Sequence, residues 1–207
     1  MKNNSQGQNI YLNGADSMLY APQARKINVR GNLFHAHTVG DSTSYPQTSS
    51  INHLIDSLRH EDWGVRQNSA KKLGELANKH ALEPLIKTLR DDKDSFVRYR
   101  AAEALGKIAN KRAVDVLINA LYDPDLFVRR TAIEALSIIK DSRAIKPLLC
   151  KISGDEECSV CESAAEALAK IGDPRTLPGL EQIINSDIDE GRRALAIHTF
   201  EVIKARR

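Results

Sequence analysis

From residue 51 to the end of the chain, apolar positions recur in one pattern at a period of 31 or 32 residues. The leucines that open each period are Leu54, Leu85, Leu117, Leu148 and Leu180. A period of this length is typical of stacked helical hairpins, in which no single unit can bury its own apolar face. The pattern predicts five units, at residues 51–81, 82–113, 114–144, 145–176 and 177–207.

The second unit, residues 82–113, shows how one period is built. Residues 85–89 carry an apolar stripe at helical spacing, and the polar run at residues 91–94 ends that helix. A second stripe begins near residue 95 and predicts the antiparallel partner helix. Its apolar positions are Val97, Ala101, Ala104, Leu105 and Ile108.

The same apolar positions recur in every unit, which predicts continuous rows along the stack. The second-helix row of large residues is Leu73, Leu105, Leu136, Leu168 and Phe200, and the row one turn later is Leu76, Ile108, Ile139, Ile171 and Ile203. The small residues between them are Ala70, Ala101, Ala132, Ala164 and Ala196. Small side chains allow neighbouring helices to approach to about 8–10 Å, so we expect close packing between units.

Two polar rows accompany the apolar ones. An acid recurs before each second helix, at Asp62, Asp94, Asp125, Glu157 and Asp189. Because a carboxylate there accepts free N–H groups and is favoured by the helix dipole, we expect helix caps. The residues four positions later are Arg66, Arg98, Arg129, Cys161 and Arg193. We expect the arginines to reach the next loop's carboxylate in exposed ion pairs that set register, each contributing about 0–1 kcal/mol.

Residues 1–50 have a different character. They are rich in Asn, Ser, Gln and Gly, and they contain no Glu. Residues 9–12 and 27–30 alternate in polarity before turn dipeptides, which predicts short strands, whereas the polar composition is typical of a disordered tail. Both interpretations stay open for this N-terminal extension. Residues 42–50 have the composition of a flexible linker.

Charge and composition limit the function classes. The formal net charge of +3 is close to neutral for 207 residues, so bulk electrostatics do not demand a nucleic-acid partner. The first residues lack the apolar run of a signal peptide, and no stretch reaches the roughly 18 apolar residues that span a bilayer. The three cysteines all lie in the fourth unit, which is not a disulfide framework. We therefore expect a reducing, cytoplasmic setting and no membrane partner.

Two segments, DKDSFVRYRAAEALGKI and DPDLFVRRTAIEALSII, each contain a loop acid, a Val-Arg pair and a small-residue run through Glu-Ala-Leu. A third segment, AAEALAKIGDPRTLPGL, contains the same run followed by a Gly-Asp-Pro-Arg turn. They resemble HEAT-like repeats of the type first named from phycobilisome lyases, and the resemblance covers about three-quarters of the chain. It implies an all-α fold, a right-handed α-solenoid of five HEAT-like hairpins whose second helices line a concave face. The stretch INVRGNLFHAHTVGD resembles polar segments of bacterial multidomain proteins, which favours a prokaryotic source.

Cysteine chemistry is the least repeat-like feature of the chain. Cys158 and Cys161 have the C-x-x-C spacing of zinc and redox sites, and Cys150 lies on the preceding predicted helix. A structural zinc site needs four ligands and a second C-x-x-C is absent, so we expect small buried side chains here and no cofactor or metal. The weaker metal candidates are His198, next to this unit, and the pair His35 and His37.

Candidate binding residues come from the exposed side of the second helices. Two positions before the leucine row stand Lys71, Glu103, Glu134, Glu166 and His198. The glutamates form either an acidic stripe for a basic partner segment or a solvated face balanced by the arginines. Trp63, Phe96 and Phe127 either pack between units or form an exposed aromatic rim. The residues that we expect to contact a partner are Tyr99, Glu103, Arg130, Glu134, Glu162 and Glu166.

No glycine-rich phosphate loop, nucleophile elbow or complete catalytic set is present in the sequence. This favours a non-enzymatic scaffold that binds a protein or peptide on the concave face. The family resemblance implies an alternative, a phycobilin lyase or lyase subunit acting on bilin attachment to a phycobiliprotein. Nucleic-acid binding is a third, less favoured class. Metal-dependent hydroxylases built on HEAT repeats carry several His-Glu pairs on helices; His60-Glu61 is the single pair here and falls in a predicted loop, which excludes that class.

Overall fold

The computed structural model describes residues 46–206. They contain ten α-helices and no strand: α1 Pro46–Ser57, α2 Trp63–Leu76, α3 Leu82–Asp91, α4 Ser95–Ile108, α5 Val114–Ala120, α6 Leu126–Ile139, α7 Ile145–Gly154, α8 Cys158–Ile171, α9 Leu177–Ile184 and α10 Glu190–Lys204. Single 3₁₀ turns join the hairpins: η1 Lys79–Ala81, η2 Lys111–Ala113, η3 Ser142–Ala144 and η4 Pro174–Thr176.

Two predictions concern the N-terminal region, and one of them falls outside the described residues. The predicted tail or strands, together with His35 and His37, lie outside residues 46–206. The expected linker at residues 42–50 is wrong in part, because α1 begins at Pro46. None of the helices between residues 46 and 206 is long and apolar enough to cross a membrane.

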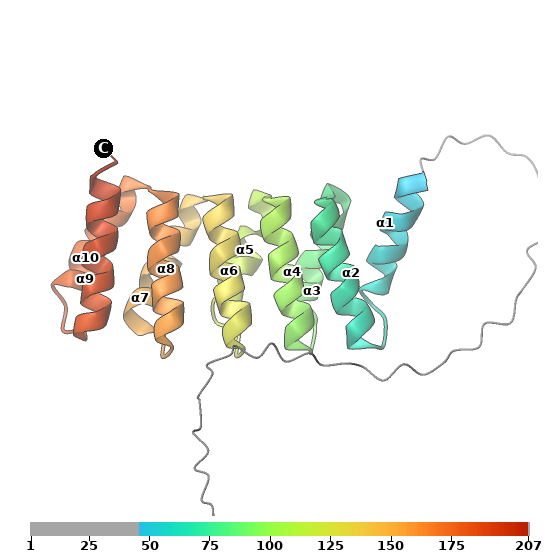
Figure 1. The fold of residues 1–207 in the computed structure, drawn as a ribbon, viewed down its shortest axis with the longest axis horizontal. Helices are drawn as coiled ribbons and strands as arrows, with labels where there is room; N and C mark the ends of the chain where they lie inside the picture. Colours follow the sequence, from blue (N-terminus) through green and yellow to red (C-terminus); the bar gives the residue numbers. More distant parts are fainter. Residues whose placement is uncertain (1–45, 207) are drawn as a thin grey trace, which may run out of the picture. The chain divides into compact units, whose positions relative to one another are not determined.

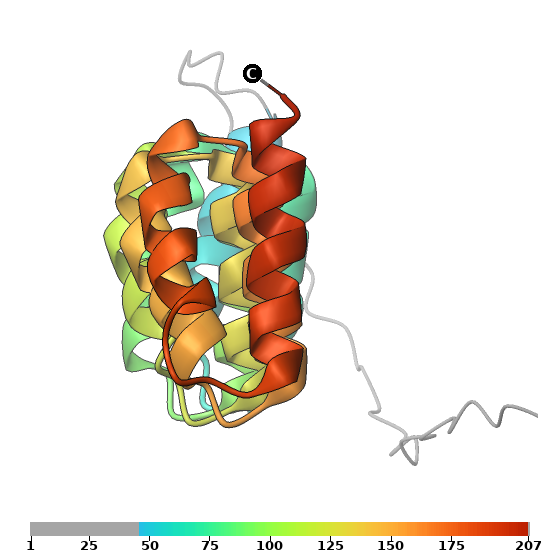
Figure 2. The same ribbon diagram turned by 90° about the vertical axis from the view of Figure 1, so that its left-hand side faces the viewer.

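The helices form two layers that follow the chain in order. The second helix of each hairpin (α2, α4, α6, α8 and α10) lies beside its counterpart in the next hairpin, and the first helices form the other layer (Figures 1 and 2). Second helices pack closer to one another than first helices do, which places them on the inner side of the stack. The prediction of an α-solenoid of five helical hairpins is confirmed.

The predicted leucine rows form the core of this stack, whereas the predicted row one turn later is buried only at Ile139 and Ile203, and its first member, Leu76, is 55% exposed. Leu85, Leu117, Leu148 and Leu180 are fully buried, and so are Leu73, Leu105, Leu136 and Leu168. Leu54 and Phe200, each at one end of its row, are only partly buried, whereas Leu180 and Leu73 at the opposite ends are fully buried. Leu54 and Phe200 lie in end units, which have one neighbour instead of two.

Glycine and alanine set how closely the second helices approach. A Cβ added at Gly74 of α2 would lie 2.8 Å from both the Cα and the Cβ of Ala104 in α4. A Cβ at Gly106 of α4 would lie 3.0 Å from the Cβ of Ala135 in α6. The helices therefore touch backbone to side chain at these points, and a larger residue has no space there.

Carboxylates cap the second helices as the sequence predicts. Asp62, Asp94, Asp125 and Asp189 each accept backbone N–H groups through Oδ1. Glu157 is the exception and makes no side-chain cap. Glutamate is one methylene longer than aspartate, and it is not among the preferred capping residues.

The arginine row forms a ladder between adjacent loops, and it is buried. The pairs are Arg66 with Asp92, Arg98 with Asp123 and Arg129 with Asp155, at N–O distances of 2.7, 2.7 and 3.4 Å. No side chain in these pairs is more than 13% exposed, so the expectation of exposed pairs was wrong. The carboxylates involved lie two residues before the capping acids, which the sequence pattern did not single out.

Arg98 shows how one ion pair of the ladder connects the loops. Its Nε and Nη2 donate to both carboxylate oxygens of Asp123, at 2.7 and 2.8 Å. Its Nη1 donates to the backbone carbonyls of Asp92 and Lys93, in the loop before its own helix, at 2.9 and 3.2 Å. One guanidinium therefore ties two successive loops together, and Asp123 raises its pKa.

The Arg129–Asp155 pair is longer than the other two pairs of the ladder, and two cations share its carboxylate. The Nζ of Lys151 donates to Asp155 Oδ2 at 3.1 Å, alongside Arg129. Burial raises the pKa of Asp155, but the backbone N–H of Glu157, the Lys151 ammonium and the charge of Arg129 outweigh it, so the net pKa is lowered. The carboxylate therefore stays ionised inside the stack.

The ladder stops at the fourth unit, where Cys161 occupies the arginine position. The Cys161 thiol lies 3.4 Å from the carbonyl oxygen of Lys151. Instead, Arg192 of α10, in the fifth unit, donates to the backbone carbonyls of Ser153 and Asp155 at 2.8 and 2.7 Å. The junction between the fourth and fifth units is therefore held by arginine–carbonyl bonds in place of a buried ion pair.

Gly74→Ala should destabilise the protein by about 1–3 kcal/mol, because the new methyl group overlaps Ala104. The matched control is Gly154→Ala, where a Cβ meets nothing within 4 Å and the better helix former should not destabilise. Urea unfolding followed by circular dichroism measures both. Equal midpoints for the two variants would contradict the close approach of α2 and α4.

Arg98→Met should cost about 3–5 kcal/mol of stability, because it leaves the buried Asp123 carboxylate without its cation. Arg112→Met removes an exposed pair with Glu83 and should change the unfolding midpoint far less. The same urea titration compares the two. A similar, small effect at both positions would show that the ladder carries no more stability than surface ion pairs.

Candidate functional site

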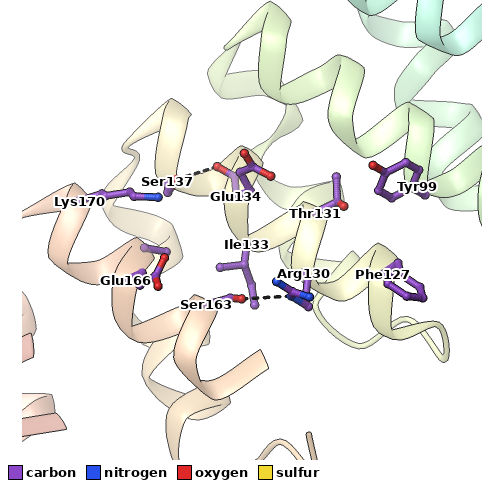
Figure 3. A pocket seen from close by; sticks show the side chains of 11 residues that line it. Tyr99, Phe127, Arg130, Thr131, Ile133, Glu134, Ser137, Ser163, Glu166 and Lys170 are labelled. Atoms are coloured by element: carbon purple, nitrogen blue, oxygen red, sulfur yellow. Dashed lines mark hydrogen bonds between the residues drawn. The ribbon is translucent and has the colours of Figure 1, made fainter. Parts of the chain in front are cut away.

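A groove of about 350 Å³ runs across the middle of the second-helix layer. Its walls come mainly from α6 and α8, with one residue of α4 (Figure 3). The lining residues are Tyr99, Phe127, Arg130, Thr131, Ile133, Glu134, Ser137, Ser163, Glu166, Ala167 and Lys170. We call this the α6–α8 groove.

Helical spacing positions the four charged groups of the groove. Arg130 and Glu134 are four residues apart on α6, and Glu166 and Lys170 are four apart on α8, so each pair shares one helix face. Arg130 reaches across toward α8, where its Nε lies 3.4 Å from the hydroxyl of Ser163 (Figure 3). None of the four forms an ion pair within residues 46–206.

The neighbouring glutamate of the same row has a different environment. Glu103 on α4 is bonded by Arg100 at 2.9 Å and by Lys107 at 2.7 Å. Burial raises the pKa of Glu103, but the hydrogen bonds from these two cations outweigh it, so the net pKa is lowered. Its charge is thus neutralised within its own helix, whereas the ladder arginines are bound in the loops and do not balance the glutamate row.

The structure brings together some of the residues that we expected to contact a partner. Tyr99, Arg130, Glu134 and Glu166 line the α6–α8 groove. Glu103 lines a smaller, adjoining groove of about 150 Å³, and Glu162 is exposed on α8 outside both. Sequence reasoning missed Lys170 and Ser163, although extending the glutamate stripe by one turn of α8 would have reached Lys170.

The serine hydroxyls of the groove are already bonded to the backbone. The Ser137 and Ser163 hydroxyls donate to backbone carbonyls of Glu134 and Ser159, at 2.8 and 2.7 Å, so neither is activated by a base. Among the described residues, no histidine or cysteine lines the groove. What it offers a ligand is charges of both signs beside aromatic rings.

The cysteines lie at the start of α8 and on α7. Cys150 and Cys158 are exposed, so the expectation of buried cysteines is wrong for these two. Cys161 is 1% exposed, and burial raises the pKa of its thiol. A raised thiol pKa lowers the thiolate fraction that reacts or binds metal. Within residues 46–206, no group of three or more His, Cys, Asp or Glu is arranged to hold a metal ion.

The aromatic residues at the start of the second helices are exposed. Trp63, Phe96 and Phe127 have exposed fractions of 48%, 61% and 60%. The rim interpretation therefore fits their exposure, and the interpretation that they pack between units holds only for Trp63 and Phe96, which contact each other across two units. The rings of Trp63 and Phe96 lie 6.0 Å apart, so they contact each other along the surface.

Comparisons with known proteins agree with this architecture. Family models for HEAT repeats match residues 85–150 and 139–201, and a further HEAT repeat model matches residues 51–80. The comparison with curated proteins finds no match.

Among solved structures, a similar chain comes from the complex of CpcE and CpcF of phycocyanin lyase from Nostoc sp. PCC7120. It is 26% identical with a TM-score of 0.59, over 83% of this chain and 69% of that chain. A designed armadillo repeat protein in complex with the peptide (KR)4 is 20% identical with a TM-score of 0.54, over 74% and 83%. Human deoxyhypusine hydroxylase is 18% identical with a TM-score of 0.52, over 76% and 75%. At these identities the last two share the fold alone.

Proposed function

The chain belongs to the HEAT-repeat proteins, and from that premise we propose that it is a scaffold whose α6–α8 groove binds a peptide segment of a partner protein. The observation that carries the proposal is the set of four unpaired charges in one groove. Arg130, Glu134, Glu166 and Lys170 keep their bonding capacity for a ligand, whereas Glu103 next to them does not.

The lining of the groove supports a peptide over a small apolar ligand. Arg130 offers a forked donor that suits carboxylates and backbone carbonyls, and Glu134 and Glu166 accept bonds from amides or cations. Tyr99 and Phe127 supply the apolar contact area. Aromatic and arginine side chains are enriched among the residues that dominate binding energy at protein interfaces.

A second candidate function is a bilin lyase or lyase subunit. It is supported by the 26% identity to a chain of the phycocyanin lyase complex, over most of this chain. A fold hosts many functions, so this candidate rests on similarity and not on a tetrapyrrole site. In this case a bilin and a phycobiliprotein would be the ligands, and a second subunit would complete the active protein.

Reversing two charges in the groove should weaken peptide binding without unfolding the protein. Peptides selected from a random displayed library against the full chain provide the probe. Glu134→Lys combined with Glu166→Lys should weaken the selected peptides by about tenfold or more in Kd, measured by fluorescence anisotropy. Both glutamates are exposed, so the circular dichroism spectrum should not change.

The matched control for this test is Glu83→Lys combined with Glu181→Lys, two reversals of exposed glutamates on α3 and α9 in the other helix layer. It should leave the Kd of the selected peptides unchanged. Equal loss in both variants would point to bulk charge, and unchanged binding in the groove variant would overturn the assignment of the α6–α8 groove.

The lyase candidate predicts a change in the bilin itself. If the protein holds a bilin, mixing the two should shift and sharpen the visible absorption band, because a fixed chromophore samples fewer conformations than a free one. The absorption spectrum is recorded with and without an apo-phycobiliprotein. An unshifted spectrum in both mixtures would remove this candidate and leave the peptide scaffold untouched.

A further inference from the structure

The loops between the first and second helix of each hairpin form one edge of the stack, which we call the loop edge. Trp63, Phe96 and Phe127 lie on it, in the first two positions of α2, α4 and α6. Each is about half exposed or more, although Trp63 and Phe96 contact each other. Three aromatic rings from successive hairpins thus form an exposed aromatic row, and exposed aromatic patches of this kind mark interaction surfaces.

The charges on the loop edge are predominantly negative. The loop carboxylates that form no ion pair within residues 46–206 are Glu61, Asp62, Asp94, Asp125, Glu156, Glu157 and Asp187. The cations of the same loops without an ion pair are Arg59 and Lys93. The ladder arginines do not change this balance, because they are already bound to other carboxylates.

Each aromatic ring has a carboxylate beside it in sequence. Asp62 precedes Trp63 directly, and Asp94 and Asp125 stand two residues before Phe96 and Phe127. These acids cap their helices through Oδ1, and Oδ2 accepts no hydrogen bond from residues 46–206. A ring and a free carboxylate oxygen thus recur at the start of the second helix in three successive hairpins, with the ring one position closer to the acid in the first.

We propose that the aromatic row and its capping carboxylates bind an extended, arginine-containing segment of a partner protein. A guanidinium stacks on an aromatic face and pairs with a carboxylate at the same time. Neighbouring helices are about 8–10 Å apart, and one turn of a polyproline II segment spans three residues and about 9 Å, with every third side chain on the same face. A partner with arginine at every third position therefore matches one cation to each hairpin.

The loop edge is a different surface from the α6–α8 groove, for which we proposed peptide binding. Phe127 is the one residue that the two share, because it also lines the groove. The loop edge needs neither Glu134 nor Glu166, so the two proposals can fail separately. Its negative charge also excludes nucleic acid as the occupant, because phosphates would be repelled.

Trp63 supplies a direct readout, because it is the single tryptophan of the chain and belongs to the row. The probe is a short synthetic peptide with arginine at every third position, separated by serine and glycine. Titrated into the full chain, it should change the Trp63 emission saturably. A peptide of the same design with glutamate in place of arginine should leave the emission unchanged.

Variants then separate the row from the rest of the surface. Phe96→Ala should raise the Kd of the arginine peptide by about tenfold or more. Asp94→Asn combined with Asp125→Asn should also weaken it, because asparagine keeps the cap and removes the charge. Leu76→Ala, an equally exposed site at the other end of α2, should have no effect, and neither should Glu134→Lys.

Three results would overturn the proposal. The first is an emission that no arginine peptide changes saturably. The second is equal binding of the arginine and glutamate peptides, or an unchanged Kd in Phe96→Ala. The third is an emission that changes with protein concentration alone, which would make a second copy of the chain the occupant of the row.

Discussion

The architecture depends on one constraint: successive second helices must touch, because no hairpin can bury its own apolar face. The contact is made where Gly74 meets Ala104 and Gly106 meets Ala135, positions at which even a methyl group has little or no space. This closeness brings the second helices to the inner side of the stack. It also places their solvent-facing residues at regular intervals, which is what allows residues from neighbouring hairpins to line a common groove.

Burial of the arginine ladder determines which charges remain for binding. Arg98 is used entirely between two loops, so it cannot balance the glutamates on the helix faces. Glu103 is neutralised by cations of its own helix, while Glu134 and Glu166 are not. A row that looks uniform in sequence is therefore divided in the structure. The fourth unit adds a second irregularity, since Cys161 ends the ladder and Arg192 replaces it with carbonyl bonds.

Local chemistry explains why some features of this chain were predictable. Helix capping by Asp94 depends on one side chain and the N–H groups two and three residues later, so sequence spacing is enough. The linker at residues 42–50 shows the opposite case, because composition does not reveal where a helix begins. The candidate site was predictable in part. The helical spacing of the glutamates located Glu134 and Glu166, but it did not indicate that Ser163 would lie beside Arg130.

The sequence by itself determined the hairpin repeat, the core rows and the capped helix starts, because each follows from spacing within one unit. Only the tertiary structure decided that the arginine pairs are buried, that Trp63, Phe96 and Phe127 face solvent, and that four charges share a groove without pairing. Burial and pairing depend on the distance and rotation between adjacent units. Those quantities are set by contacts between side chains about thirty residues apart, which periodicity along the chain does not specify.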